Sequence, residues 1–113
     1  MLPKTRRVSR LLKERTEGVR ARVFSNSDFR ITVYPFSGPS VFSCAVAKKI
    51  LPRAVDRNRT RRRLYTIVQE LLPSIKNGNL CMVQVRTREV GGLDQVRLKE
   101  SLMSLLMKAA VMD

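Results

Sequence analysis

The sequence predicts a small α+β protein, a single two-layer domain whose helices pack on a mixed four-stranded sheet in the order α-β-β-β-α-β-α. With 113 residues the chain lies in the usual range for one compact domain, so we assign residues 1–113 to one unit. Segments with apolar residues at every second position alternate with segments of helical periodicity. Apolar residues make up 43% of the chain and aromatic residues only 5%, so the core must be aliphatic.

The first predicted element is a short helix from Ser9 to about Gly18. Ser9 is a suitable N-cap, Leu11 and Leu12 form its apolar side, and Gly18 is suited to end it. The apolar stripe is narrow, so this helix would bury little surface.

A β-hairpin is predicted next. Residues 22–24 and 29–34 alternate β-branched or aromatic residues with polar ones, and the segment 25–28, Ser-Asn-Ser-Asp, has turn chemistry. The core-facing residues of the second strand would be Phe29, Ile31 and Val33. A turn at 37–40 then precedes a nearly continuous apolar run, 41–47, that is typical of a central strand.

The main helix is predicted from Ala54, just after Pro52, to Leu72, where Pro73 ends it. Its apolar residues follow the i, i+3, i+4, i+7 spacing of a helix on a core, at Leu64, Ile67, Val68 and Leu71.

The last two elements are a fourth strand and a second long helix. A turn at Asn77-Gly78-Asn79 precedes the strand, which spans 80–85. After Gly91-Gly92, helical spacing continues through the C-terminus at Leu98, Leu102, Leu105, Leu106 and Ala109.

The charge of the chain is its main functional signal. It has 23 Lys and Arg, 9 Asp and Glu and no His, a formal net charge of +14. Such self-repulsion indicates a polyanionic partner, because neutralising phosphates releases condensed counterions. Nucleic acid is the first candidate, and an anionic membrane surface or a merely soluble basic protein are the alternatives.

The setting is expected to be the cytoplasm. No secretory signal follows the charged N-terminus, and no run approaches the ~20 apolar residues of a membrane span. Cys44 and Cys81 each sit in an apolar strand segment, where thiols pack as small hydrophobes, and this favours a reducing compartment.

The positive charge is concentrated in two blocks, residues 1–22 and 48–63, with eight basic residues in each. In the second block Asp56 is the only acid. At about 100° per residue, the helix face opposite the apolar stripe would hold Asn58, Arg62, Tyr65 and Gln69, with Arg59 beside them and with Arg57, Arg61 and Arg63 flanking the stripe. Arginine predominates, which favours phosphate and planar bases as partners.

No catalytic or metal-binding set can be named from the sequence. An autonomous nuclease needs a general base or clustered carboxylates, but the chain has no His and its acids are scattered. Cys44 and Cys81 have no further ligands at the spacing of a zinc site.

The segment 54–64, Ala-Val-Asp-Arg-Asn-Arg-Thr-Arg-Arg-Arg-Leu, resembles the arginine–asparagine–arginine signature helix of the bacterial ribonuclease P protein family. The preceding Ala-Val-Ala-Lys-Lys at 45–49 and the opening Met-Leu-Pro-Lys are similar to the family's as well. The resemblance implies a subunit of the endoribonuclease that removes the 5′ leader of precursor transfer RNA. In that family the RNA subunit and its Mg²⁺ ions are the catalyst, so no cofactor of the protein itself is expected.

The resemblance also implies site residues and an unusual topology. The residues implied to face the catalytic RNA are Lys48, Lys49, Arg53, Arg57, Asn58, Arg59 and Arg62. The resemblance implies a leader groove between the first helix and the sheet. The residues expected along this groove are Arg30, Thr32, Tyr34, Arg61 and Tyr65. The general expectation for a β-α-β crossover is right-handed, whereas the family has a left-handed one.

Two departures from the family weaken the leader assignment. The family usually has aromatic residues on its first helix, where this chain has Leu11 and Leu12, and an Arg-Glu pair after the signature, where it has Tyr65-Thr66. No obligate protein partner is expected. A stand-alone ribosomal or RNA-assembly protein is the alternative function, and a DNA-binding protein that inserts the 57–63 helix in a major groove is a weaker one.

Overall fold

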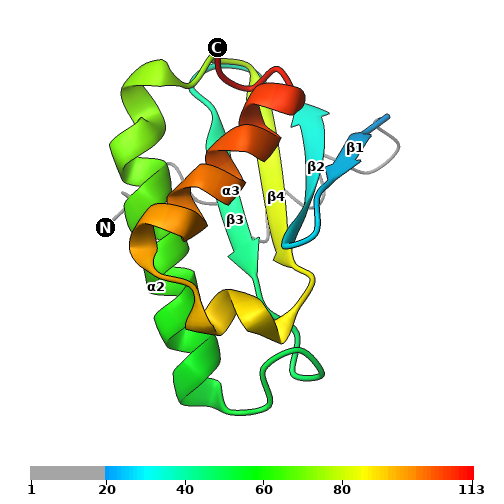
Figure 1. Ribbon diagram of the computed structural model, residues 1–113. Coiled ribbons are helices and arrows are strands. Elements are labelled where there is room, and N and C mark those ends of the chain that lie inside the picture. Colours follow the sequence, from blue (N-terminus) through cyan, green and yellow to red (C-terminus); the bar gives the residue numbers. More distant parts are fainter. Residues whose placement is uncertain (1–19) are drawn as a thin grey trace.

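The structure is a computed structural model that describes residues 20–113 (Figure 1). The helix predicted at Ser9–Gly18 and the first basic block up to residue 19 lie outside the described residues. The described elements are the strands β1 (Arg22–Ser25), β2 (Phe29–Pro35), β3 (Val41–Ala45) and β4 (Asn79–Val85), the helices α2 (Ala54–Leu71) and α3 (Gln95–Lys108), and 3-10 turns at Leu72–Ser74 and Arg88–Gly92.

The four strands form one mixed sheet in the order β1-β2-β4-β3. β2 pairs antiparallel with both β1 and β4, and β3 pairs parallel with β4. In Figure 1 the helices lie toward the viewer, β3 and β4 both run downward, and β4 lies to the right of β3. The crossover through α2 is therefore left-handed, which confirms the topology implied by the family and not the general expectation.

One sequence prediction about β3 is wrong. Its apolar run predicts a central strand, but among residues 20–113 β3 pairs only with β4 and lies at the sheet edge. Phe42 and Cys44 on its inner side belong to the main core, whereas on its other side Val41 packs with Leu80 in a second cluster and Ala45 is exposed. It also ends at Ala45, before the turn that contains Ala47.

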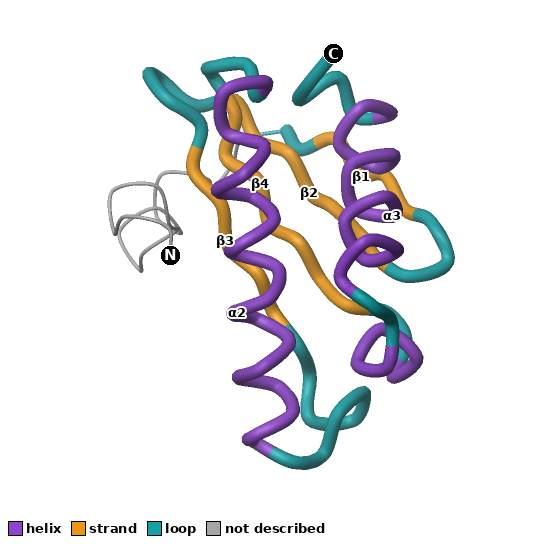
Figure 2. The backbone as a smooth tube through the Cα atoms, turned by 60° about the vertical axis from the view of Figure 1, so that its left-hand side comes forward, coloured by secondary structure: helices purple, strands orange, loops and turns teal. Residues whose placement is uncertain are grey.

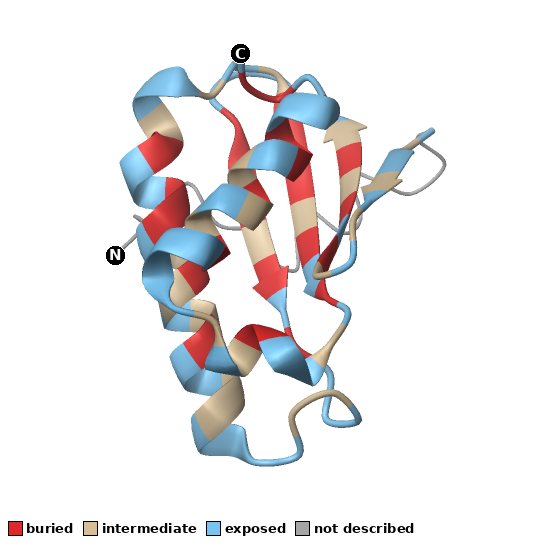
Figure 3. Cartoon of the chain, in the orientation of Figure 1, coloured by how far each residue is buried: buried red, intermediate tan, exposed pale blue. Residues whose placement is uncertain are grey.

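Both helices cover the same face of the sheet and enclose the main core (Figure 2). The predicted core face of β2 is confirmed, because Phe29, Ile31 and Val33 are at most 1% exposed. The helical stripe is confirmed as well, and Thr60 lies in line with Leu64 at 2% exposure. Figure 3 shows the resulting pattern, with buried residues on the inner sides of both helices and exposed ones outside.

The C-terminal helix is shorter than the sequence predicts. α3 ends at Lys108 because Ala110 adopts a left-handed conformation (φ 59°) and the Val111 N–H donates to the Leu106 carbonyl (3.0 Å), which caps the helix. The chain then turns back, and Met112 forms a β-bridge with Ile75. Within residues 20–113 neither helix has the length and apolar character needed to cross a membrane.

The Cys81 side chain is 0% exposed, at the centre of the sheet. Burial raises the pKa of its thiol to about 12, although Arg22 acts in the opposite direction. A thiol that stays neutral is unreactive. We therefore expect iodoacetamide at pH 8 to leave Cys81 unmodified in the folded protein and to alkylate it in urea, as read by peptide mass spectrometry.

The raised pKa of Cys81 also predicts how the stability of the folded protein depends on pH. Above the ordinary thiol pKa of 9.0 the unfolded chain releases the Cys81 proton while the folded chain retains it. This contribution to stability is therefore complete below pH 9 and decreases as the pH rises toward 12. In the iodoacetamide test, rapid alkylation of Cys81 in the folded protein would show that β4 is not packed as described.

Candidate nucleic-acid interface

The first half of α2 and the loop before it form a basic surface. Its members, all exposed, are Lys48, Lys49, Arg53, Asn58, Arg59 and Arg62. We call these six residues the basic surface. Those on the helix, Asn58, Arg59 and Arg62, lie on the side that the core does not use, as the sequence predicts, because buried residues such as Leu64 and Ile67 occupy the inner side.

Most of this charge is not neutralised within the described part of the chain. The ion pairs are Arg53–Asp56, Lys76–Asp113, Arg97–Asp94 and Lys99–Glu70. Within residues 20–113, Lys48, Lys49, Arg59 and Arg62 therefore have no carboxylate within ion-pair distance. The Arg53–Asp56 pair, at 3.8 Å and exposed, is weak. A surface with this composition is suited to bind phosphates.

Arg57 differs from its neighbours because it fastens the loop that precedes the helix. One of its guanidinium nitrogens, Nη1, donates to the carbonyls of Leu51 (2.9 Å) and Pro52 (2.8 Å). The helix has no side-chain N-cap at Arg53, so these contacts help to fix its start. Arg57 thus has a structural role that the sequence did not reveal, and its contact with RNA stays a prediction.

Arg61 and Asn58 are joined on one side of α2, where the Arg61 guanidinium donates to the Asn58 Oδ1. This contact spans one helical turn and holds both side chains at the edge of the basic surface. The residue that we expected to lean toward the leader groove is therefore linked to one that we expected to face the catalytic RNA.

Arg63 links α2 to the start of α3. Its guanidinium donates to the Leu93 carbonyl and to the Gln95 Oε1 (3.0 Å). Burial, followed by repulsion from Arg59, lowers the pKa of Arg63, and Asp94 opposes the shift. Arg59 and Arg63, one helical turn apart on α2, therefore disfavour one another's charge.

The strand residues predicted for leader binding alternate outward along β2. Arg30 is exposed, and Thr32 and Tyr34 are half-buried, on the face that α2 and α3 do not cover. Tyr34 packs there against the small cluster of Val41 and Leu80. The predicted groove also requires the first helix, which lies outside the described residues, so the structure does not test it.

The predicted orientation of Tyr65 is wrong. The helical projection placed it on the exposed face, but its side chain packs against the main core and its hydroxyl accepts a hydrogen bond from the Cys44 N–H (3.1 Å). Cys44 lies on the edge strand β3, whose buried backbone donor needs an acceptor. Much of the Tyr65 ring therefore packs inside the protein, and its contact with the leader stays a prediction.

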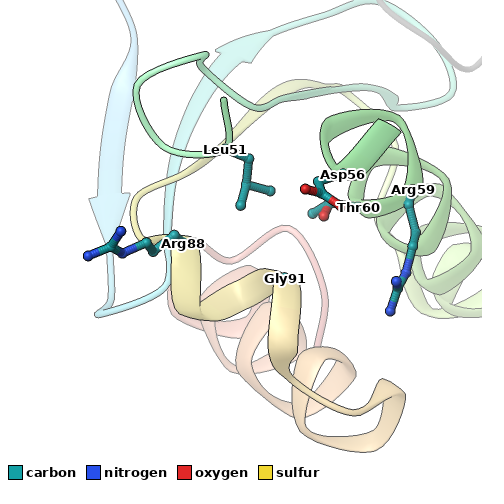
Figure 4. A pocket seen from close by; sticks show the side chains of 6 residues that line it. All are labelled: Leu51, Asp56, Arg59, Thr60, Arg88 and Gly91. Atoms are coloured by element: carbon teal, nitrogen blue, oxygen red, sulfur yellow. The ribbon is translucent and has the colours of Figure 1, made fainter. Parts of the chain in front are cut away.

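A pocket that the sequence did not indicate lies beside the basic surface. It has a volume of about 240 Å³ and lies between the first two turns of α2 and the 3-10 turn Arg88–Gly92 (Figure 4). Its lining residues are Leu51, Asp56, Arg59, Thr60, Arg88 and Gly91. In the sequence, a hint of this pocket was Val90, an apolar residue next to two glycines. In the structure Val90 is 0% exposed and holds the 3-10 turn on the core.

The fold and the basic surface together define a small basic α+β protein of a polyanion-binding type. No three His, Cys, Asp or Glu side chains within residues 20–113 are grouped so as to hold a metal ion. Comparison with known proteins then specifies the family: the model of the ribonuclease P family matches residues 6–110. The chain belongs to the ribonuclease P protein family.

Individual relatives agree with this assignment. The chain is 35% identical over 74 residues to the ribonuclease P protein component of Microcystis aeruginosa, a match that spans 66% of this chain and 61% of that protein. It is 32% identical over 91 residues to the component from Chloroflexus aggregans, with 80% and 67% covered. Its fold is similar to that of the Staphylococcus aureus RNase P protein, with a TM-score of 0.82, 18% identity and coverage of 97% and 100%.

Proposed function

We propose that this chain is the protein subunit of ribonuclease P and that it binds the catalytic RNA through the basic surface. The observation that carries the proposal is the set of cations at the start of α2 that have no carboxylate partner within residues 20–113, Arg59 and Arg62 above all. The family membership and the names of the relatives support the same role.

The chemistry is proposed to reside in the RNA subunit, with Mg²⁺ ions held by RNA phosphates. The chain has no His, the side chain that most often acts as a general base, and within residues 20–113 no three carboxylates are grouped so as to hold a metal ion. Its exposed Lys and Arg side chains are suited to position phosphates and to neutralise their charge.

The substrate is proposed to be precursor transfer RNA, whose single-stranded 5′ leader would lie along the outer face of β2. Arg30 and Tyr34 supply the charge and the π-face that hold a single strand without reading its sequence. Thr32 borders the same path, whereas Arg61 and Tyr65 lie on α2 over the opposite face of the sheet, and their contact with the leader is a separate prediction. The proposed site of this function is the cytoplasm.

Reconstitution tests the proposal directly. Added to a bacterial ribonuclease P RNA at low Mg²⁺, the chain is expected to raise the cleavage rate of precursor transfer RNA, because its cations offset phosphate repulsion between the two RNAs. A substrate without a leader is expected to gain less. If the chain binds ribosomal RNA tightly and leaves cleavage unchanged, the alternative of a stand-alone RNA-binding protein is correct.

A further inference from the structure

The pocket beside the basic surface has a chemistry that phosphate binding does not require. Figure 4 shows the Asp56 carboxylate and the Leu51 side chain directed into the space between α2 and the 3-10 turn, with Arg59 at its rim. The Arg88 guanidinium points away from this space in the same view. The pocket therefore combines the Asp56 carboxylate and the Thr60 hydroxyl with an apolar wall.

Asp56 is the only acid between residues 48 and 63, in the segment with the densest positive charge. A carboxylate there weakens attraction for any phosphate, so generic RNA binding gives no reason for it. Within residues 20–113 its oxygens accept no hydrogen bond, and its ion pair with Arg53 spans 3.8 Å in solvent. The carboxylate is therefore available to a ligand.

An apolar contact and a small volume limit what the pocket can hold. A Cβ built on Gly91 would lie 3.6 Å from the Leu51 Cδ2, so the leucine side chain and the glycine backbone meet at one side of the pocket. The volume of about 240 Å³ is just below the ~300 Å³ at which small-molecule sites begin, so the pocket has room for one base and not for a longer segment.

We propose that this pocket receives a single unpaired guanine of the RNA partner, with the Asp56 carboxylate accepting hydrogen bonds from the guanine N1–H and N2 amino group. Among the four RNA bases only guanine presents two adjacent donors on its Watson–Crick edge, the edge by which proteins read splayed-out RNA bases. Arg59, at the rim, lies where it can bind the phosphate of the same nucleotide. The inference rests on the proposed RNA-binding function and adds a base preference to it.

The test measures the binding of three short single-stranded RNAs by fluorescence anisotropy in buffer with EDTA. One is an oligoadenylate, the second carries one central guanosine, and the third carries inosine there, which keeps N1–H and lacks the N2 amino group. We expect the guanosine RNA to bind about ten-fold more tightly than the oligoadenylate, with inosine in between.

Two variants separate base recognition from charge and from folding. Asp56→Asn is expected to abolish the guanosine preference while strengthening binding of the oligoadenylate, because the net positive charge rises by one. Glu100→Gln makes the same charge change on α3, at a residue that does not line the pocket, and is expected to keep the preference. Gly91→Val fills the pocket at a φ that L-residues adopt, leaves every charge in place, and is also expected to abolish the preference.

The outcomes are distinguishable. Equal affinities of the wild-type chain for all three RNAs would overturn the guanine pocket and leave the RNA-binding proposal intact. A preference that Asp56→Asn and Gly91→Val both retain would place recognition elsewhere and overturn it as well. A chain that binds none of the RNAs at low salt would contradict the proposed function itself.

Discussion

Replacing Arg59 and Arg62 together by alanine is expected to reduce the affinity for ribonuclease P RNA by at least ten-fold at moderate salt. Both side chains are exposed on the basic surface and lack ion-pair partners within residues 20–113, so each is expected to contact one phosphate. Each lost phosphate contact removes roughly one unit from the slope of log K against log salt concentration. Filter binding at several salt concentrations measures both quantities.

The matched control removes the same charge from the other end of the molecule. Lys76 precedes β4 and Lys108 ends α3, and in Figure 1 both of these points lie opposite the start of α2. The double alanine variant at these lysines is expected to leave the slope almost unchanged. Equal losses in the two double variants would mean that net charge, and not the basic surface, determines the binding.

Arg57 is a poor choice for that experiment even though the sequence singles it out equally. Its contacts with the Leu51 and Pro52 carbonyls fix the loop before α2. An alanine there would release the loop and disturb Lys48 and Lys49 indirectly. A loss of affinity would then combine a missing phosphate contact with a displaced surface.

The elements of the fold were largely predictable because their signals are local. The alternation in Phe29–Tyr34 and the helical stripe through Leu64 and Ile67 directly report which side faces the core. The edge position of β3 was not predictable in the same way. A short apolar run has the same sequence pattern at an edge as in the centre of a sheet, because its inner-face residues are buried in both places.

The site was predictable in its charge but not in its contacts. That Arg59 and Arg62 face outward follows from helix geometry, whereas Tyr65 turns inward because the Cys44 N–H, 21 residues away, requires an acceptor. The pocket depends on a turn that lies about 30 residues beyond Asp56 in the chain. Contacts between distant segments of this kind cannot be read from the spacing of residues in a single sequence.

The core beneath the basic surface is expected to be the most sensitive part of the protein to mutation. Leu64 is 0% exposed on α2, between the basic half of the helix and its ordinary amphipathic half. Leu64→Ala is expected to lower the free energy of unfolding by about 2–5 kcal/mol, the range found for buried leucines that leave a cavity. This is a large part of the ~5–15 kcal/mol by which a typical domain is stable. Repulsion among the arginines on the basic half of α2 opposes any closer packing that would fill the cavity.

Urea unfolding followed by circular dichroism measures the effect, with Val55→Ala as the control. Val55 lies on the same helix at 55% exposure, so its truncation is expected to change stability by less than ~0.5 kcal/mol. Because repulsion among the cations falls with ionic strength, added salt is expected to restore part of the stability lost in the Leu64 variant. A loss below ~1 kcal/mol for Leu64→Ala would mean that the basic half of α2 is not held on the sheet by this stripe, and that its cations are oriented by some other contact.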